Sequence, residues 1–229
     1  MVMSDWQFAA VSLFYTTLKG YVSRLSPPLY VAAMLPIRYH PIPGDPRIQQ
    51  LAPDLLAARV DPHFRSSYHL EEEGMAPAFV LEVVSPESRR RDTVDKRRAY
   101  EAMGVQEYLL FDPVGGLLTP RLQGYRREGE RLVWWERDGK GRLLSEALGA
   151  WLTMRGDDLR LERRDGTLEP SPAEAEARAR EEALARERAE AAARAEALAR
   201  ERAEEEVRRL AAELARLRAR LEHRDSNEG

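Results

Sequence analysis

One carboxylate stands inside an otherwise apolar segment. Glu82 is the only charged residue in the run from Ala78 to Val84. A short run of this kind, rich in β-branched residues, is typical of a strand covered on both faces. A carboxylate buried there loses its hydration, which is costly unless a metal ion, a cation or hydrogen-bond donors compensate. Glu82 is therefore a candidate catalytic and metal-binding residue; the alternative is a strand-end carboxylate whose tip reaches solvent.

Lys96 is the second candidate, because lysine is rare in this chain. The 36 basic residues include only three lysines, at positions 19, 96 and 140. In so arginine-rich a sequence, an ammonium at position 96 suggests a role that a guanidinium would not fill. In the first turn of a helix the side chain would lean toward the helix N-terminus, and so toward the end of the strand that carries Glu82. The alternative is an ordinary solvated helix lysine.

Asp54 completes a possible catalytic set. It follows Pro53 and precedes the apolar run Leu55–Ala57. Two carboxylates on adjacent strands can hold a metal ion that polarises a phosphodiester and helps to ionise water, and a nearby lysine can stabilise the developing negative charge. Together these residues suggest a metal-dependent site that cleaves phosphodiesters. Taken alone, Asp54 more simply caps or solvates the start of a strand.

The segment between Glu82 and Lys96 is strongly basic. Arg89, Arg90 and Arg91 precede a helix that we expect over residues 93–103, with Asp92 as its N-cap and Asp95 in the capping-box position. Arginines beside a helix N-terminus favour a phosphate, so these three are candidate phosphate- and DNA-binding residues. The alternative is a solvated basic loop.

Composition excludes several classes of function. The formal net charge of -3 argues against a protein that is basic overall, so any DNA contact must use a local patch. The chain has no cysteine, which excludes disulfides and thiolate metal sites, and its four histidines lack metal-ligand spacing. Oxygen ligands and a hard cation such as Mg²⁺ remain possible. We find neither a membrane-spanning run nor a signal peptide, and we expect a cytoplasmic protein.

Two regions of different composition divide the chain. Residues 1–169 are mixed and globular in composition. Apolar spacing predicts a helix near residues 6–24, and strand-like runs are found at 29–35, 55–60, 78–84, 108–111, 121–126 and 132–135. The last two runs could form a hairpin across residues 128–130. The expected fold class is α/β, with a mixed sheet flanked by helices.

Residues 170–223 form the second region, which is rich in Ala, Glu and Arg. It contains no glycine, and no proline after Pro172, so we expect one helix of roughly 50 residues. Val207, Leu210, Leu214, Leu217 and Leu221 are spaced 3, 4, 3, 4, which predicts a coiled coil at the C-terminal part and hence a homo-oligomer. Leu184 and Leu198 fall outside that phase, so a solvated single helix is the alternative. We expect residues 224–229 to be disordered.

Several short motifs together resemble a known family. They are Pro53-Asp54, the segment 79–86, Arg91-Asp92 through Lys96, Tyr100, the segment 104–108 and the segment 111–113. This combination resembles the Uma-type restriction endonucleases of bacteria, from about Leu51 into the tail. Many members also carry an N-terminal Tyr-Glu-Leu-Ile-Asp-Gly segment, which we do not find in this chain.

The resemblance implies a PD-(D/E)XK nuclease fold and a Mg²⁺-dependent (or Mn²⁺-dependent) deoxyribonuclease. It implies that Asp54 and Glu82 bind the metal, with the carbonyl of Val83 as a third ligand, and that Lys96 supplies the catalytic ammonium. The superfamily's usual lysine position, two residues after the glutamate, is Val84 here. A non-catalytic nuclease-like module, which binds nucleic acid or organises partners through the coiled coil, is the competing hypothesis.

Overall fold

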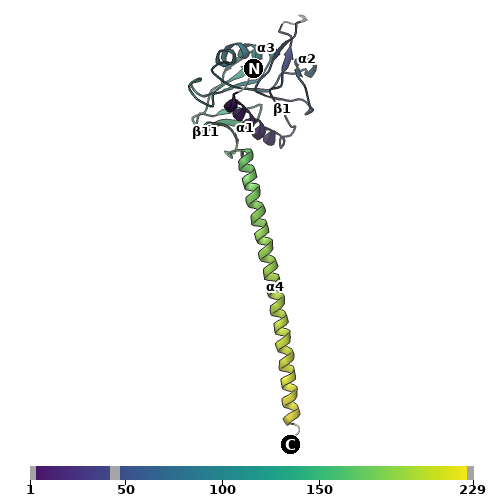
Figure 1. Ribbon diagram of the computed structural model, residues 1–229. Helices are drawn as coiled ribbons and strands as arrows, with labels where there is room; N and C mark the ends of the chain where they lie inside the picture. Colours follow the sequence, from purple (N-terminus) through teal and green to yellow (C-terminus); the bar gives the residue numbers. More distant parts are fainter. Residues whose placement is uncertain (1–3, 42–46, 226–229) are drawn as a thin grey trace. The chain divides into compact units, whose positions relative to one another are not determined.

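The computed structural model describes residues 4–41 and 47–225. The chain forms two compact units, Met1–Ala173 and Glu174–Gly229. The first unit holds the sheets and their core, and the second is the C-terminal helix from its third residue on (Figure 1).

A six-stranded sheet forms the centre of the first unit. Its strands lie in the order β1 (Tyr30–Ala33), β4 (Leu55–Ala58), β6 (Phe79–Val83), β7 (Glu107–Phe111), β8 (Leu122–Glu128) and β9 (Arg131–Trp134). β6 and β7 are parallel, and the other neighbouring pairs are antiparallel. The mixed α/β fold class is therefore confirmed, as is the hairpin formed by β8 and β9.

Helices cover the two faces of this sheet, and strands separate α1 from α3 (Figure 1). α1 (Asp5–Val22) packs against one face, where Phe14 and Leu18 join Phe79 and Leu81 in one core cluster. On the other face, Tyr100 of α3 (Arg97–Met103) packs in a second cluster with side chains such as Val80. Alternate residues of β6 thus enter opposite layers, and Glu82 lies on the same face as Val80, toward α3.

The helix before α3 begins earlier than the sequence predicted, and this corrects the assignment of Asp92 as its N-cap. Ser85 and Ser88 form a reciprocal pair at the start: Ser88 N donates to Ser85 Oγ at 3.1 Å, and Ser85 N donates to Ser88 Oγ at 3.0 Å. Pro86 follows Ser85, as suits a first helical position. Asp92 lies within the π-helical segment η1 (Arg91–Lys96), where its own N–H donates to Ser88 O at 2.8 Å. Its buried side chain is therefore free to face the sheet.

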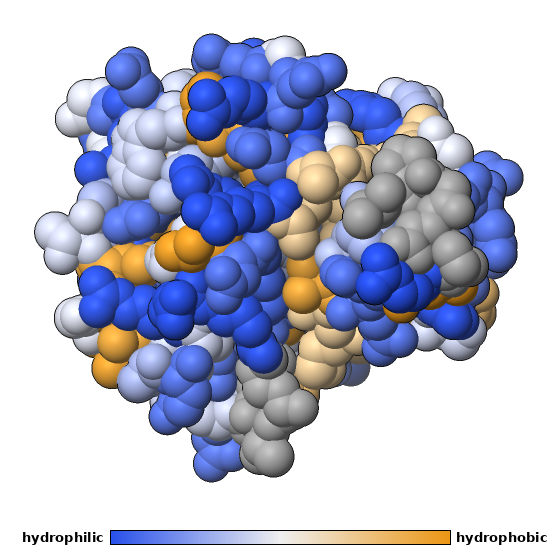
Figure 2. Space-filling model, turned by 90° about the horizontal axis from the view of Figure 1, so that it is seen from above, coloured by the Kyte–Doolittle hydropathy of each residue, from blue (hydrophilic) through white to orange (hydrophobic). Residues whose placement is uncertain are grey.

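Several smaller elements were not anticipated. β2 (Ile37–Tyr39), β3 (Gln49–Leu51) and β5 (Tyr68–His69) form a small sheet, followed by α2 (Leu70–Glu73). β10 (Leu143–Ser145), β11 (Ala150–Arg155) and β12 (Asp158–Arg163) form an antiparallel sheet, and α1 contacts β12. Figure 2 shows one face of the molecule, on which hydrophilic residues predominate around a narrow hydrophobic band.

The tail is one uninterrupted helix, α4 (Pro172–Asp225), of 54 residues (Figure 1). Ion pairs one turn apart, such as Arg186 with Glu190 at 2.9 Å, run along its exposed surface. Val207, Leu210 and Leu214 are exposed, and the coiled coil stays a prediction. Of the expected disordered end, Arg224 and Asp225 are helical, and residues 226–229 lie outside the described residues. In the described part of the chain, no helix has the length and apolar character needed to cross a membrane.

Candidate active site

Asp54 and Glu82 lie opposite each other on adjacent strands. β4 and β6 are antiparallel with Leu55 opposite Leu81, so the next step of this register places Asp54 opposite Glu82. Leu56 and Val80, two residues further into each strand, pack in the same core cluster. Both carboxylates therefore face the layer that contains α3, which the nuclease hypothesis requires.

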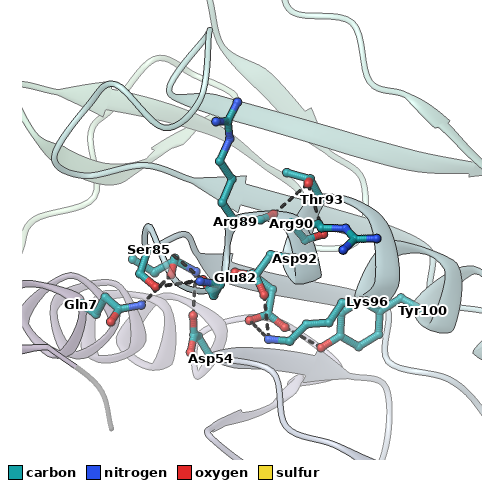
Figure 3. A network of polar contacts seen from close by, with 12 residues as sticks. Gln7, Asp54, Glu82, Ser85, Arg89, Arg90, Asp92, Thr93, Lys96 and Tyr100 are labelled. Atoms are coloured by element: carbon teal, nitrogen blue, oxygen red, sulfur yellow. Dashed lines mark hydrogen bonds and ion pairs between the residues drawn. The ribbon is translucent and has the colours of Figure 1, made fainter. Parts of the chain in front are cut away.

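Glu82 is held by two donors from the helix above it. Lys96 Nζ donates to Glu82 Oε2 at 2.6 Å, and Tyr100 Oη donates to Glu82 Oε1 at 2.6 Å (Figure 3). Lys96 and Tyr100 are four residues apart, so both reach the same strand residue from one helix face. Glu82 is 1% exposed and Lys96 is 4% exposed. Neither is the solvated side chain that the alternative interpretations would require.

Asp92 adds a third carboxyl group to this cluster. Its Oδ1 lies 3.0 Å from Lys96 Nζ. The contact is an ion pair: Oδ1 is buried and has no hydrogen-bond partner in the described part of the chain. The backbone at Asp92 is fixed by Tyr108, whose hydroxyl donates to the Asp92 carbonyl oxygen at 2.7 Å. One ammonium therefore serves two buried carboxylates here.

Val83 connects this cluster to α1. The N–H of Val83 donates to Asp54 Oδ2 at 2.7 Å, and its carbonyl oxygen accepts from Gln7 Nε2 at 3.0 Å (Figure 3). Gln7 also closes the capping box of α1 with Ser4. Val83 lies beyond the part of β6 that pairs with β4. The side chains of Asp54 and Gln7 therefore complete the backbone hydrogen bonds that β4 would otherwise make.

Burial shifts the acid–base behaviour of the cluster. Desolvation raises the pKa of Glu82 to about 8; the negative charges of Asp54 and Asp92 add to this increase, and Lys96 opposes it. Desolvation also raises the pKa of Asp54, against the hydrogen bond from Val83 and the charge of Lys96. For Lys96, burial lowers the pKa, but the adjacent Glu82 and Asp92 outweigh burial and raise it. Glu82 and Asp54 thus hold protons more strongly than usual, while the lysine stays charged.

The three predicted phosphate-binding arginines lie in the first turns of the same helix. Arg89, Arg90 and Arg91 are exposed. Arg89 and Arg90 extend away from Glu82 (Figure 3). They are therefore placed to meet a ligand at the surface of the helix rather than inside the buried cluster.

The donor types at the site suit a hard divalent cation. Asp54, Glu82 and the Val83 carbonyl offer oxygen atoms, and the carboxyl groups outnumber the single ammonium. Among the described residues, no three Asp, Glu, His or Cys side chains form a ready cage for a metal. A cation here would be bound by two carboxylates, a carbonyl and water, and the bonds of Glu82 to Lys96 and Tyr100 would have to rearrange.

Sequence reasoning missed two members of this site. Tyr100 was noted only as part of a motif, although its spacing of four from Lys96 was a usable signal. Gln7 gave no signal of its own, because only the fold brings it to Val83, 76 residues away. Asp92 was identified, but as a cap rather than as a buried acid.

Comparison with known proteins gives two findings. The family model Uma2, described as "Putative restriction endonuclease", matches residues 1–155. Among solved structures, the chain is similar to a "putative nuclease belonging to DUF820" from Anabaena variabilis, with 14% identity, a TM-score of 0.43, and coverage of 60% of this chain and 70% of that chain. No curated protein matches.

Proposed function

Because this chain belongs to the Uma2 family, described as putative restriction endonucleases, we propose that it is a metal-dependent endonuclease that hydrolyses DNA phosphodiester bonds. One observation supports the position of the site above all. Asp54 and Glu82 meet on adjacent strands with Lys96 bonded to Glu82, in a sheet whose buried side chains are mostly apolar. A buried group of acids and one lysine is costly for folding alone, which favours a role in chemistry.

Each of these residues takes a separate role in the proposed reaction. Asp54, Glu82 and the carbonyl of Val83 would hold Mg²⁺ or Mn²⁺, which when bound would polarise the phosphoryl oxygens and lower the pKa of water. Lys96 would donate to the negative charge that develops on the phosphate. Arg89, Arg90 and Arg91 would contact the DNA backbone outside the buried cluster, since all three are exposed at the start of the same helix.

A second candidate function rests on the closed state of the cluster. Both oxygens of Glu82 already accept hydrogen bonds, from Lys96 and Tyr100, and Lys96 is 4% exposed. A site that stays in this arrangement would bind no metal. The protein would then be a catalytically inactive nuclease-fold protein that binds nucleic acid or organises partners.

The tail supplies the assembly part of the proposal. Val207, Leu210 and Leu214 present exposed apolar side chains along one phase of α4, which favours a homo-oligomeric coiled coil in solution. A DNA substrate also implies a cytoplasmic location, which we propose with it.

Cleavage of supercoiled plasmid tests the proposed activity. The full chain is incubated with EDTA, Mg²⁺ or Mn²⁺, beside a Glu82→Gln variant. We expect nicking that requires metal and disappears in the variant, while circular dichroism shows an intact fold. Glu107→Gln is the matched control, because Glu107, on the neighbouring strand β7, is another buried glutamate and is bonded to Ser145 of β10. Equal nicking by wild type and Glu82→Gln refutes the site, and no cleavage with any metal favours the second candidate.

A further inference from the structure

Lys96 contacts two buried carboxylates, and the proposed reaction leaves it only one of them. Its Nζ lies 2.6 Å from Glu82 Oε2 and 3.0 Å from Asp92 Oδ1 (Figure 3). In the proposed reaction Glu82 binds the metal, so the carboxylate that makes the shorter contact is also the one that the metal takes. The position of the ammonium then depends on Asp92.

The backbone of Asp92 is fixed on both sides. Its N–H donates to Ser88 O at 2.8 Å, and its carbonyl oxygen accepts from Tyr108 Oη at 2.7 Å. Tyr108 is 0% exposed and belongs to β7, so this bond ties η1 to the sheet. Asp92 and Lys96 are also four residues apart, a spacing at which helical side chains meet. The position of Asp92 therefore does not depend on what Glu82 binds.

The Asp92 carboxylate does not cap the helix that carries it. Ser85 and Ser88 form the cap, and Asp92 Oδ1 accepts no hydrogen bond from the residues that the structure describes. Asp92 is 1% exposed, and a buried carboxylate costs several kcal/mol unless a cation compensates. Lys96 supplies such a cation at 3.0 Å. The burial of Asp92 is thus explained by its contact with the lysine rather than by the helix.

The charges of a metal-loaded cluster balance when Asp92 is counted. When ionised, Asp54, Glu82 and Asp92 carry three negative charges, against one positive charge on Lys96. One divalent cation brings the total to zero, which suits a buried site. Without Asp92 the loaded cluster would carry a net positive charge, and repulsion between metal and ammonium would drive Lys96 outward.

The metal should displace Lys96 from Glu82 rather than Tyr100. Each of the two donors bonds to one oxygen of Glu82 at 2.6 Å. The Tyr100 hydroxyl is neutral at neutral pH, so a nearby dication does not repel it as it repels the ammonium. Tyr100 can therefore keep its oxygen of Glu82 while the ammonium leaves.

We propose that Asp92 is a positioning residue that holds the Lys96 ammonium at the site when the metal takes Glu82. Metal binding then changes the partners of Lys96 from two carboxylates to one. Of the three ammonium protons, one bonds to Asp92 and the others face the phosphate. The inference rests on the proposed function, since it uses the metal site of Asp54 and Glu82. Asp92 acts through Lys96 and touches neither metal nor substrate.

NMR of the full chain with ¹⁵N-labelled lysine tests this proposal without any cleavage. Lys19 and Lys140 are exposed, whereas Lys96 is 4% exposed, so the Lys96 ammonium should be the one that exchanges slowly enough with water to give a sharp signal. In the wild type we expect saturating Mg²⁺ to shift this signal and leave it sharp. In Asp92→Asn the signal should be sharp without Mg²⁺, because Glu82 still holds the ammonium, and should be lost with it.

Plasmid nicking gives a second readout. Asp92→Asn should lower kcat about tenfold or more, the usual cost of losing the partner behind a functional side chain. KM for plasmid should stay nearly unchanged, because the exposed arginines that would contact DNA remain. Asp92→Glu keeps the charge and should recover part of the rate. Asp95→Asn is the matched control, since Asp95 is exposed in the same π-helical segment, and it should behave as wild type.

The proposal is overturned if Mg²⁺ abolishes the wild-type Lys96 signal or leaves it unshifted, and neither result depends on the folding of a variant. It is also overturned if Asp92→Asn keeps a sharp signal in Mg²⁺ or nicks as fast as wild type. Nicking by the wild type together with any of these results leaves the nuclease function standing. Loss of the signal in Asp92→Asn with Mg²⁺, without nicking in any metal, would support the role of Asp92 and reject the nuclease function.

Discussion

Gln7 Nε2 donates a 3.0 Å hydrogen bond to the carbonyl oxygen of Val83, and so joins the first turn of α1 to the end of β6. The same side chain accepts from the N–H of Ser4 at 3.2 Å and thereby caps its own helix. One buried amide therefore sets the position of α1 against the strand that carries Glu82. It also occupies one lone pair of the proposed third metal ligand and leaves the other available.

Gln7→Glu tests this relationship. The substitution replaces the donor with a carboxylate oxygen that faces the Val83 carbonyl, so we expect the metal-free protein to lose about 1–3 kcal/mol of unfolding free energy. The new carboxylate also adds an oxygen ligand, so Mn²⁺ should raise the melting temperature more than in wild type. Thermal unfolding with and without Mn²⁺ measures both effects.

Gln106→Glu is the control for that experiment. The exposed Gln106 also donates its side-chain amide to a backbone carbonyl, that of Gly104 at 2.7 Å. Because it is solvated, its replacement should change stability by less than about 0.5 kcal/mol and leave the response to Mn²⁺ unaltered. A Gln7→Glu protein that behaves like this control would contradict the structural role of Gln7.

Lys96→Arg should impair cleavage although the charge is kept. The guanidinium is bulkier, and it must fit in a buried space between Glu82 and Asp92 that now holds one ammonium at 2.6 and 3.0 Å. We expect cleavage to fall by about 10²-fold or more, the cost typical of removing one transition-state donor. Lys140→Arg, at an exposed lysine, should have no effect. Initial nicking rates of the three proteins decide the matter; equal rates would mean that Lys96 is a structural ion-pair partner only.

Metal affinity should depend on pH in a defined direction. Burial raises the pKa of Glu82 from 4.5 to about 8, so below pH 8 a proton competes with the metal for this carboxylate. Affinity should rise with pH, by about tenfold per unit when one proton is displaced, and level off above about 8. Titration calorimetry with Mn²⁺ at several pH values tests this, and an affinity that does not vary between pH 6 and 8 would contradict it.

The same shift affects folding when no metal is bound. Between the unfolded pKa of 4.5 and the folded pKa of about 8, the native state keeps a proton that the unfolded chain has lost. Unfolding free energy from Glu82 should therefore fall as pH rises through this window. Glu82→Gln should flatten the dependence, as measured by urea unfolding in EDTA at a series of pH values. A wild-type curve as flat as that of the variant would argue against the raised pKa.

Two leucines in the tail offer a matched test of assembly. Leu210 lies in the 3, 4 spacing and Leu198 lies outside it, and both are 48% exposed. Leu210→Glu should reduce the mass measured by light scattering, whereas Leu198→Glu should not. Truncation after Ala173, at the end of the first compact unit, should have the effect of Leu210→Glu. An equal number of chains per particle in all four proteins would identify α4 as a solvated single helix.

The sequence was informative where one residue differed in chemical type from the residues around it. Glu82 inside an apolar strand was predicted to be buried, and Lys96 among arginines was predicted to point toward the end of that strand; the two bond to each other at 2.6 Å. β6 was predictable because its run is continuous and apolar, as a strand covered on both faces must be. The hairpin of β8 and β9 was predictable from a turn segment between two strand-like runs.

Elements that depend on distant contacts could not be predicted. The strands β10, β11 and β12 were not predicted, although Leu159 and Leu161 alternate with polar residues in β12; the sequence does not show that the three strands pair with one another and pack against α1. The buried face of α1 includes the polar side chains of Gln7 and Thr17, whereas the apolar Ala9 is exposed, although apolar spacing was the basis for predicting this helix. The polar type of Gln7 suggests an exposed residue, but its side chain is buried because it bonds to Val83. Of the adjacent residues Trp134 and Trp135, Trp135 lies in the core and Trp134 is exposed.

The π-helical segment from Arg91 to Lys96 has a consequence for chain length. A wider turn absorbs one more residue than a regular α-helix would, between the cap at Ser85 and the residues that hold Glu82. Deleting one residue within η1 would let this turn become a regular α-helical turn and would leave the turns on either side in nearly the same rotational relation, because the wide turn holds about one residue more than the regular one. We therefore expect such a deletion to keep both the cap at Ser85 and the bonds of Lys96 and Tyr100 to Glu82. The same deletion between Arg97 and Tyr100, in the regular α3, would rotate Tyr100 by about 100° relative to Lys96 and separate the two donors.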